Sequence, residues 1–429
     1  MNPRKNVLFI NHSVRHGGPG KSLYYILKYI DREQLTPLVL VPKHDVFTEQ
    51  MEEIGLAENV IVDSRFPENI MRPVLGGGGR GEGREGRRER SSMPAKALSI
   101  ALNVIGIMWL LAASPFMIRK KKVELIYCNG TLAKIVGALM GLLNLRPVIW
   151  HVRNIQQKAP LRITMGVLAR LGAVKRIICV SKAAALQFAH VSPKVRVINN
   201  GLDIEEFDPA GRTDGALRET YGLGDDVTVV GSTGRVVPRK GYASMIKAAR
   251  VVKERLSAGG EAGGTGAGSV KFVIVGDTPH FFRINHLEEL KRLTKEIGVD
   301  DMVVFTGYAE DVKPYLKEFD IFVIPSNYPD PFPRAVIEAM AFSLPVIGFK
   351  QGGIVESVED GVTGVLLDPE GGGEGGAAEC MAEAVLGLIR DEEKRARMGA
   401  AGRERVKSKF QARDIARKIE KEIMETLSA

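Results

Sequence analysis

The chain is poor in cysteine, histidine and aromatic residues, and each shortage removes a class of protein. Among 429 residues there are 3 cysteines, 7 histidines and 6% aromatics. Cys128, Cys179 and Cys380 form no pair with metal-ligand or redox spacing. The first two lie in apolar runs, where a small thiol packs as a hydrophobe. We therefore expect no disulfide scaffold, no bound metal, and a reducing, cytoplasmic compartment.

The chain also lacks a visible secretory signal, because its first apolar run, Val7 to Ile10, is too short. A longer uncharged stretch, residues 97–118, is followed by the basic sequence 119–122. By length it could span a bilayer. Strand-like runs of one apparent domain lie on both sides of it, however, so we expect a buried or interfacial helix. The basic cluster could then rest on anionic headgroups, which would make the protein peripheral at the inner face of the cell membrane.

The remaining composition is that of a folded, basic protein. Hydrophobic residues make up 45%, charged residues 26%, and the net charge is +9. The charge favours an acidic partner, such as a nucleotide or an anionic lipid surface. Glycine-rich tracts near 76–92, 257–269 and 371–378 bury little surface and are interpreted as surface insertions. The Arg/Gly tract could bind RNA, but we favour a solvated loop and do not expect nucleic acid as a partner.

Short Val/Ile-rich runs alternate with helical patterns in both halves of the chain. Continuous apolar runs interleaved with helices predict parallel sheets that are covered on both faces. The fold class is therefore α/β, with two Rossmann-like domains. We place them at residues 1–205 and 206–405, joined by the turn-rich segment 198–209, and expect a C-terminal helix over 406–429.

The segment 326–369 contains the strongest chemical signal. Two carboxylates, Asp330 and Glu338, are separated by seven residues around a Pro-Phe-Pro turn. Pro333 suits the first turn of a helix, whose free amides on Arg334 and Ala335 would bind a phosphate. Glu338, one turn further along, could accept hydrogen bonds from hydroxyl groups. Phosphate beside polyhydroxyl predicts a nucleotide-sugar.

Two further loops follow apolar strands. In the sequence GSTGRVVPRKGY, Arg235 and Lys240 lie at the end of a strand, where open α/β sheets bind ligands. Arginine forks onto phosphate oxygens and lysine supplies a point charge, so the pair can neutralise a diphosphate.

After the first strand, Gly20-Lys21-Ser22 matches the end of a P-loop, but Arg15 occupies the position of the motif's first glycine. We therefore do not expect a P-loop NTPase. The adjacent Gly17 and Gly18 have no side chains, so their backbone could approach a ligand closely.

Together these segments resemble the retaining GT-B glycosyltransferases (glycosyl transferase group 1, family 4 type). The usual pattern in that family is Glu-x7-Glu, Ala-Met-Ala, a Pro-Val strand and a Gly-Gly loop. This chain has Asp330 in place of the first glutamate, and Pro331 and Pro333 where glycines are usual. The resemblance implies two Rossmann-like domains that face each other across a cleft, and a last helix that packs back on the first domain.

The resemblance also implies roles for individual residues. It assigns Glu338 to the ribose hydroxyls, Asp330 to the transferred sugar, and His151 of the WHVRN sequence to the same sugar from the other domain. Besides Asp330 and Glu338, the donor would contact the following positions: Gly17, Gly18, Arg235, Lys240, Phe332, Arg334 and Ala335. We find no convincing Asp-x-Asp motif, so we expect transfer without metal or other cofactor.

The expected function is therefore transfer of a sugar, with retention, from a UDP- or GDP-linked donor to a glycan or lipid-linked acceptor. Synthesis of cell-surface polysaccharide or lipopolysaccharide would use such a step. Two alternatives remain open at this stage. One is another GT-B-like enzyme, such as a nucleotide-sugar epimerase, and the other is a non-enzymatic nucleotide- or RNA-binding protein.

Overall fold

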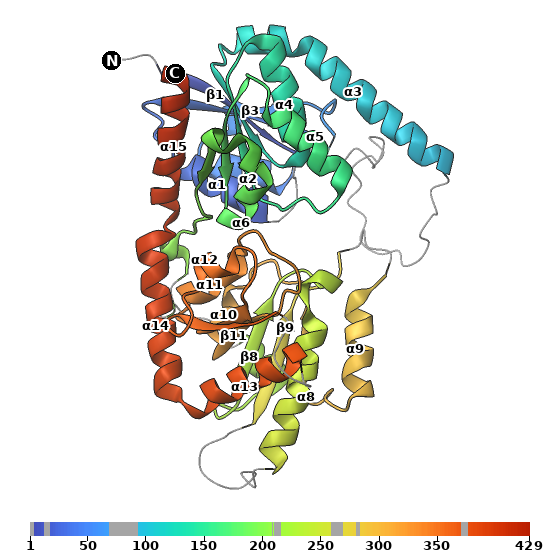
Figure 1. The fold of residues 1–429 in the computed structure, drawn as a ribbon, viewed down its shortest axis with the longest axis vertical. Helices are drawn as coiled ribbons and strands as arrows, with labels where there is room; N and C mark the ends of the chain where they lie inside the picture. The colour runs from blue at the N-terminus through green and yellow to red at the C-terminus, as the bar shows by residue number, and fades with distance from the viewer. Residues whose placement is uncertain are drawn as a thin grey trace. The chain divides into compact units, whose positions relative to one another are not determined.

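The computed structural model describes residues 4–12, 18–67, 93–207, 209, 216–258, 269–279, 284–369 and 376–429. Most of each glycine-rich tract lies outside these ranges. The chain divides into two compact units. The first combines Met1–Ile198 with Arg413–Ala429, and the second is Asn199–Ala412. Each unit contains a parallel sheet with helices packed on it (Figure 1).

The first unit is built on a seven-stranded parallel sheet among its described residues, in the order β3-β2-β1-β4-β5-β6-β7. Its strands are β1 (Lys5–Asn11), β2 (Leu35–Val41), β3 (Val60–Val62), β4 (Leu125–Asn129), β5 (Val148–Val152), β6 (Val174–Cys179) and β7 (Val195–Val197). The chain first builds β2 and β3 on one side of β1 and then crosses to β4 on the other side. The sheet therefore has a switch point between β1 and β4, which is where open α/β sheets bind ligands.

Helices cover both faces of this sheet, because alternate strand residues point to opposite faces. Leu8 and Ile10 pack on one side with α3 and α4, while Val7 and Phe9 pack on the other with α1 and α2. The principal helices of the unit are α1 (Gly18–Tyr29), α2 (Val46–Glu53), α3 (Met93–Lys120), α4 (Thr131–Asn144), α5 (Ala159–Ala169), α6 (Lys182–Ala185) and α15 (Ala412–Ser428).

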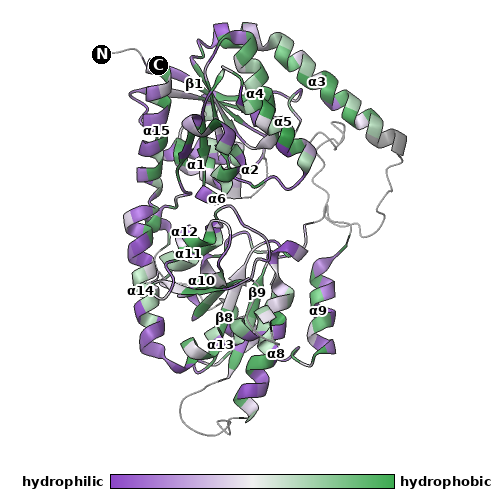
Figure 2. Ribbon diagram, in the orientation of Figure 1, coloured by the Kyte–Doolittle hydropathy of each residue, from purple (hydrophilic) through white to green (hydrophobic). Residues whose placement is uncertain are grey.

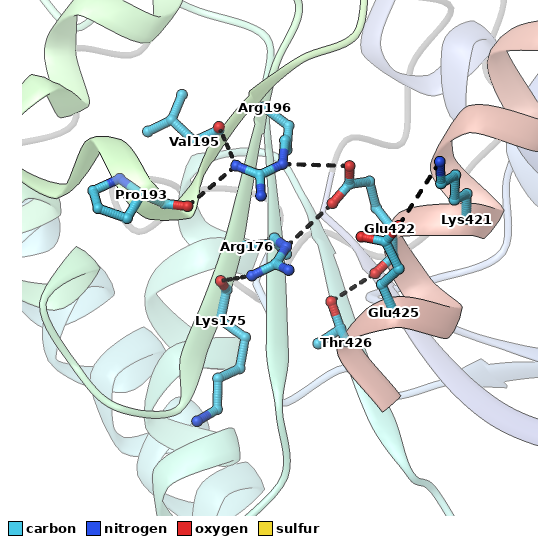
Figure 3. Close-up of polar contacts among 9 residues, drawn as sticks. All are labelled: Lys175, Arg176, Pro193, Val195, Arg196, Lys421, Glu422, Glu425 and Thr426. Carbon is cyan, nitrogen blue, oxygen red and sulfur yellow. Dashed lines mark hydrogen bonds and ion pairs between the residues drawn. The ribbon is translucent and has the colours of Figure 1, made fainter. Parts of the chain in front are cut away.

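The C-terminal helix α15 is part of the first unit's core. Its buried isoleucines, Ile415, Ile419 and Ile423, pack in the same cluster as β1. Glu422 accepts contacts from Arg176 Nε at 3.2 Å and from Arg196 Nε at 3.5 Å, which ties the helix to β6 and β7 (Figure 3). The last residues of the chain thus complete a domain that begins with the first.

The second unit has a six-stranded parallel sheet among its described residues, in the order β10-β9-β8-β11-β12-β13. Its strands are β8 (Thr228–Thr233), β9 (Val270–Val275), β10 (Val303–Gly307), β11 (Ile321–Ile324), β12 (Val346–Phe349) and β13 (Gly364–Leu367). The switch point here lies between β8 and β11. The two loops with the strongest sequence signals follow those two strands.

The principal helices of the second unit are α7 (Ala216–Tyr221), α8 (Tyr242–Ala258), α9 (His286–Glu296), α10 (Lys313–Lys317), α11 (Arg334–Ala341), α12 (Ile354–Ser357), α13 (Gly376–Arg390) and α14 (Glu392–Lys409). Residues of α8, α9, α13 and α14 form a continuous apolar core with residues from β8, β9, β11 and β12. The predicted class, two parallel α/β sheets, is confirmed.

Candidate active site

Three polar residues lie side by side at the carboxyl edge of the first sheet. The strand register places Asn11 of β1 opposite Asn129 of β4, and Asn129 opposite His151 of β5. Asn129 Nδ2 donates to Asn11 Oδ1 at 3.0 Å, and Arg153 Nε donates to Asn129 Oδ1 at 2.8 Å. The switch point of this sheet is therefore lined by hydrogen-bonding groups rather than by the apolar residues that fill the strands.

His151 is buried in this row, and its contacts determine which ring nitrogen carries the proton. Its Nδ1 contacts the hydroxyl of Tyr127 and, at 3.2 Å, Nη2 of Arg153. Since arginine can only donate, Nδ1 accepts and the ring proton is assigned to Nε2. That Nε2 atom is buried and has no hydrogen-bond partner in the described parts of the chain. His151 thus holds one N–H donor that the fold does not use.

Positive groups surround this row. Burial, then Arg153 and Lys134, hold the pKa of His151 well below its usual value, so the ring is neutral. Burial and Lys134 lower the pKa of His12 to about 4. Burial lowers the pKa of Lys134 itself to about 8. None of β1, α1, β4, α4 and β5 contains an aspartate or glutamate, so the edge has a positive field with no carboxylate from these elements to balance it.

The structure describes only part of the glycine loop that follows β1. Gly17 lies outside the described residues, and Gly18 is the first residue of α1. Gly20 and Ser22 are buried within that helix. The predicted role of Gly17 and Gly18 in donor binding stays a prediction.

In the second unit the loops after β8 and β11 meet through an ion pair. Lys240 Nζ lies 2.6 Å from Asp330 Oδ2, and the two side chains are only 14% and 8% exposed. The hydroxyl of Tyr328 donates to the same carboxylate oxygen at 3.1 Å, and Arg239 lies over the Tyr328 ring. The structure therefore brings two of the predicted site residues, 90 positions apart in the sequence, into direct contact.

Arg235 lies within electrostatic range of the same group. Partial burial and the neighbouring Arg239 lower the pKa of its guanidinium, while Tyr328 and Asp330 act in the opposite direction. Arg235, Arg239 and Lys240 place three cations around one carboxylate. This excess of positive charge suits a ligand with several negative charges, such as a diphosphate.

Close backbone approaches fix these loops. A Cβ on Gly352 would lie 2.3 Å from the Asp330 carbonyl oxygen, and one on Gly353 would lie 2.0 Å from that of Pro331. The Gly353 amide donates to Asp330 O at 2.7 Å. On the other side, Gly241 has φ +72° and packs against the Pro325 carbonyl. Gly352 and Gly353 thus pack against the backbone of Asp330 and Pro331, and Gly241 packs against the start of the same loop.

Helix α11 begins immediately after this loop. Pro333 occupies the N-cap position, and no side chain caps the helix. Arg334 Nη2 lies 3.2 Å from Glu338 Oε1 one turn later, with both side chains nearly buried, and Arg334 Nη1 donates to Gly201 O at 2.8 Å. The side chain of Arg334 therefore holds Glu338 in place, and only the backbone of Arg334 and Ala335 can serve the predicted phosphate contact.

Phe332 is surrounded by residues of its own unit, which hold both its ring and its backbone. Its buried ring packs against Phe410 with ring centroids 5.4 Å apart, and its carbonyl accepts from Asn200 Nδ2 at 3.1 Å. Asn200 therefore holds the start of α11, and its position beside a glycine in a polar run gives no sequence signal of this role. The predicted contact between Phe332 and the donor stays a prediction.

A search of the described residues finds no group of three or more histidine, cysteine or acidic side chains arranged to hold a metal ion. The phosphate-binding candidates that remain in the second unit are cations and helix amides.

Comparisons with known proteins agree on one class. Residues 214–405 match the model of the family "Glycosyl transferases group 1". A Mycobacterium tuberculosis protein, GDP-mannose-dependent alpha-(1-6)-phosphatidylinositol monomannoside mannosyltransferase, is 28% identical over 334 residues, which is 75% of this chain and 76% of that protein. The D-inositol 3-phosphate glycosyltransferase of Kribbella flavida is 29% identical over 184 residues, 42% of this chain and 40% of that protein.

Among solved structures, Anabaena Alr3699/HepE in complex with UDP and glucose superposes with a TM-score of 0.74 at 24% identity. The alignment covers 99% of each chain. At this identity the likeness establishes the fold.

Proposed function

Because the chain belongs to the glycosyl transferases group 1 family and is a retaining glycosyltransferase with the GT-B fold, we propose that it transfers a hexose from a UDP- or GDP-linked donor to a phosphate-bearing glycan or lipid-linked acceptor. The observation that carries this proposal is the position of both polar clusters at the switch points of their sheets. Cell-surface polysaccharide or lipopolysaccharide synthesis is the setting we infer for such a reaction.

The donor diphosphate is proposed to bind at the switch point between β8 and β11. Lys240 has three N–H donors, and Asp330 uses one of them. The other two remain for phosphate oxygens, and Arg235 and the first amides of α11 add further donors. The attraction between these groups and the diphosphate grows as the bond to the sugar breaks, because negative charge then develops on the leaving diphosphate. We propose that this electrostatic set replaces a metal ion.

The two carboxylates then have separate roles. Glu338 uses Oε1 for Arg334, which leaves Oε2 to accept hydrogen bonds from the ribose hydroxyls. Asp330 uses Oδ2 for Lys240 and Tyr328, which leaves Oδ1 for hydroxyls of the transferred sugar. Both carboxylates are already held in place before the donor arrives, so little side-chain entropy is lost on binding.

The sugar is proposed to receive its remaining contact from His151. The neutral ring donates through Nε2–H, and Tyr127 and Arg153 keep that proton on Nε2 by contacting Nδ1. We infer no covalent nucleophile. Substitution on the same face of the sugar, with the leaving phosphate helping to deprotonate the acceptor hydroxyl, is the mechanism that these groups favour.

The acceptor is proposed to carry a phosphate. Lys134 and Arg153 supply positive charge at the carboxyl edge of the first sheet, and the surrounding elements contain no carboxylate. The names of both curated relatives include an inositol that bears a phosphate. A phosphorylated acceptor would bring negative charge to these cations.

The test is a transfer assay with paired donors and paired acceptors. Radiolabelled GDP-mannose and UDP-glucose are each incubated with inositol 3-phosphate, unphosphorylated inositol and phosphatidylinositol. We expect one donor base to be used, and only the phosphate-bearing acceptors to receive label. Equal transfer to unphosphorylated inositol would overturn the acceptor proposal. Conversion of the donor in the absence of any acceptor would instead favour an epimerase.

A further inference from the structure

Helix α3 carries large apolar side chains on its solvent face. Trp109 is 66% and Phe116 is 72% exposed, and Leu98, Leu102 and Ile105 are exposed as well. The spacings between these five positions are four, three, four and seven residues, which place them along one face of a helix. Figure 2 shows the helix as apolar along most of its length. Monomeric soluble proteins rarely expose a continuous apolar stripe of this size.

The polar residues of α3 lie on the opposite, buried side. Ser99, Asn103 and Ser114 are almost completely inaccessible to solvent. Ser114 Oγ donates to Leu111 O at 2.8 Å, and Asn144 Nδ2 of α4 donates to Ser114 Oγ at 2.8 Å. A helix on a water-facing surface has polar residues outside and apolar residues inside. The outer face of α3 is instead apolar, while Ser99, Asn103 and Ser114 lie on the buried side beside Leu110 and Leu111, which indicates that the outer face contacts an apolar medium.

The apolar surface continues onto the end of α4. Asn144 and Ser114 hold that end beside the second half of α3. Leu142 and Leu143 are exposed there, and Leu145, just past the helix, is 88% exposed. The patch therefore spans two helices and is not a single irregular segment.

The part of the sequence that forms this patch is strongly basic. Residues 93–202 contain 16 lysines and arginines and a single acidic residue, Glu124. Glu124 is already paired with Lys5 at 2.8 Å. Four of the basic residues, Arg119 and Lys120 to Lys122, follow the apolar stripe directly, and Lys120 to Lys122 are exposed. Lysines and arginines near an anionic lipid surface are attracted to it electrostatically.

We propose that the outer face of α3, together with the end of α4, docks on an anionic lipid bilayer. The helix lies along the headgroup–acyl boundary, with Trp109 and Phe116 inserted and residues 119–122 on the headgroups. This proposal goes beyond sugar transfer and does not depend on the identity of donor or acceptor. Its partner is the lipid surface itself.

Two other occupants fit less well. By length and composition Ala97–Lys120 is a candidate membrane span. A spanning helix would, however, have to give up the buried contact between Ser114 and Asn144 and the packing of Leu110 and Leu111 in the core of the first unit. A second copy of the chain would bring two basic clusters of the same sign together. An anionic bilayer satisfies both the apolar and the charged part of the surface.

The two tryptophans of the chain allow a direct test. Trp109 is on the proposed docking face, and Trp150 is fully buried in β5. In a Trp150→Phe background, fluorescence reports on Trp109 alone. The full chain is titrated with vesicles of phosphatidylcholine, with and without 30% phosphatidylglycerol, at about 0.15 M salt. We expect a blue shift and quenching by brominated lipid only with the anionic vesicles, and weaker binding at 0.5 M salt.

Variants separate the two contributions in a sedimentation assay. Ile105→Glu/Phe116→Glu should abolish binding, while the control Ile284→Glu/Val362→Glu, at exposed apolar positions of the second unit, should not. Lys120→Glu/Lys121→Glu should lower the vesicle partition coefficient at least about tenfold. Its matched control is Lys407→Glu/Lys409→Glu on α14, and it should bind as the wild type does.

Three results would overturn the proposal. The first is an unchanged Trp109 spectrum with every vesicle. The second is a blue shift that follows protein concentration without lipid, which would assign the face to a second copy. The third is recovery of the protein in the membrane fraction after alkaline carbonate extraction, which would make α3 a spanning helix.

Discussion

Lys240 Nζ lies 2.6 Å from Asp330 Oδ2, and this ion pair joins the loops that follow β8 and β11. It bridges the switch point of the second sheet. It therefore connects the two loops at the proposed donor site.

Breaking the pair should affect both stability and donor binding. Lys240→Met leaves Asp330 charged and nearly buried without its partner, which should cost about 3 kcal/mol of unfolding free energy. It should also weaken nucleoside diphosphate binding. Thermal unfolding and titration calorimetry measure the two effects. The control is Lys253→Met, which removes a solvent-exposed partner of Asp301 and should cost at most about 1 kcal/mol.

We expect that Gly352 cannot be replaced, because a side chain there would meet the backbone of Asp330, and not only because its φ is positive. Both Gly352 (φ +58°) and Gly361 (φ +76°) adopt left-handed conformations, but only at Gly352 would a Cβ meet the backbone of Asp330. Gly361→Ala should therefore cost about 1 kcal/mol of stability and leave activity intact. Gly352→Ala should displace the Asp330 loop and abolish detectable donor binding. Equal donor affinity in the two variants would contradict this role for the glycine loop.

His151 should act as a neutral donor and not as a titrating base. Because burial holds its pKa well below the usual value, the rate of transfer should show no His151 limb between about pH 5.5 and 8. His151→Ala should lower kcat about 100-fold, as loss of one preorganised donor does, with little change in donor KM. His190→Ala is the control, since that exposed imidazole contacts only the Gly166 carbonyl in the described residues. A limb near pH 6.5 that disappears in His151→Ala would reverse the assignment.

The lowered pKa of His12 predicts how the stability of the protein depends on pH. Its folded pKa is about 4 and its unfolded value about 6.5, so the unfolded chain binds the extra proton first. Its contribution to stability is therefore complete above pH 6.5 and is lost as the pH falls from 6.5 toward 4, by up to about 3 kcal/mol. Urea denaturation at several pH values should show a shallower acid slope for His12→Gln. An unchanged slope would show that this imidazole is already protonated in the folded protein.

The sequence predicts most of the sheet framework because buried parallel strands are continuous apolar runs. β8, β9, β11 and β12 are runs of this kind, and the helix that Pro333 predicts begins at Arg334. The strands β3 and β13 have only three and four residues and lie at the edges of their sheets. Their pairing depends on a neighbouring strand that sequence periodicity does not report.

The candidate site shows the same division. The sequence motifs predict Asp330, Lys240 and Glu338 as site residues, but they do not predict the contacts that these side chains make. The pairing of Asp330 with Lys240 spans 90 positions, and that of Arg334 with Gly201 spans 133. The support given to α11 by Asn200 is equally remote in sequence. Contacts of this kind arise from chain topology, so no local pattern predicts them. The apolar outer face of α3 can also be recognised only when the burial of each residue is known.

The central claim is that the second unit binds a nucleoside diphosphate through its own side chains and amides. Titration calorimetry of the full chain with UDP and with GDP, in the presence of EDTA, tests it most directly. We expect one of the two to bind stoichiometrically to the wild type, and Glu338→Ala to weaken that binding about 10- to 100-fold through loss of the ribose contact. Binding that requires added magnesium, or an unchanged affinity in Glu338→Ala, would contradict the proposed site.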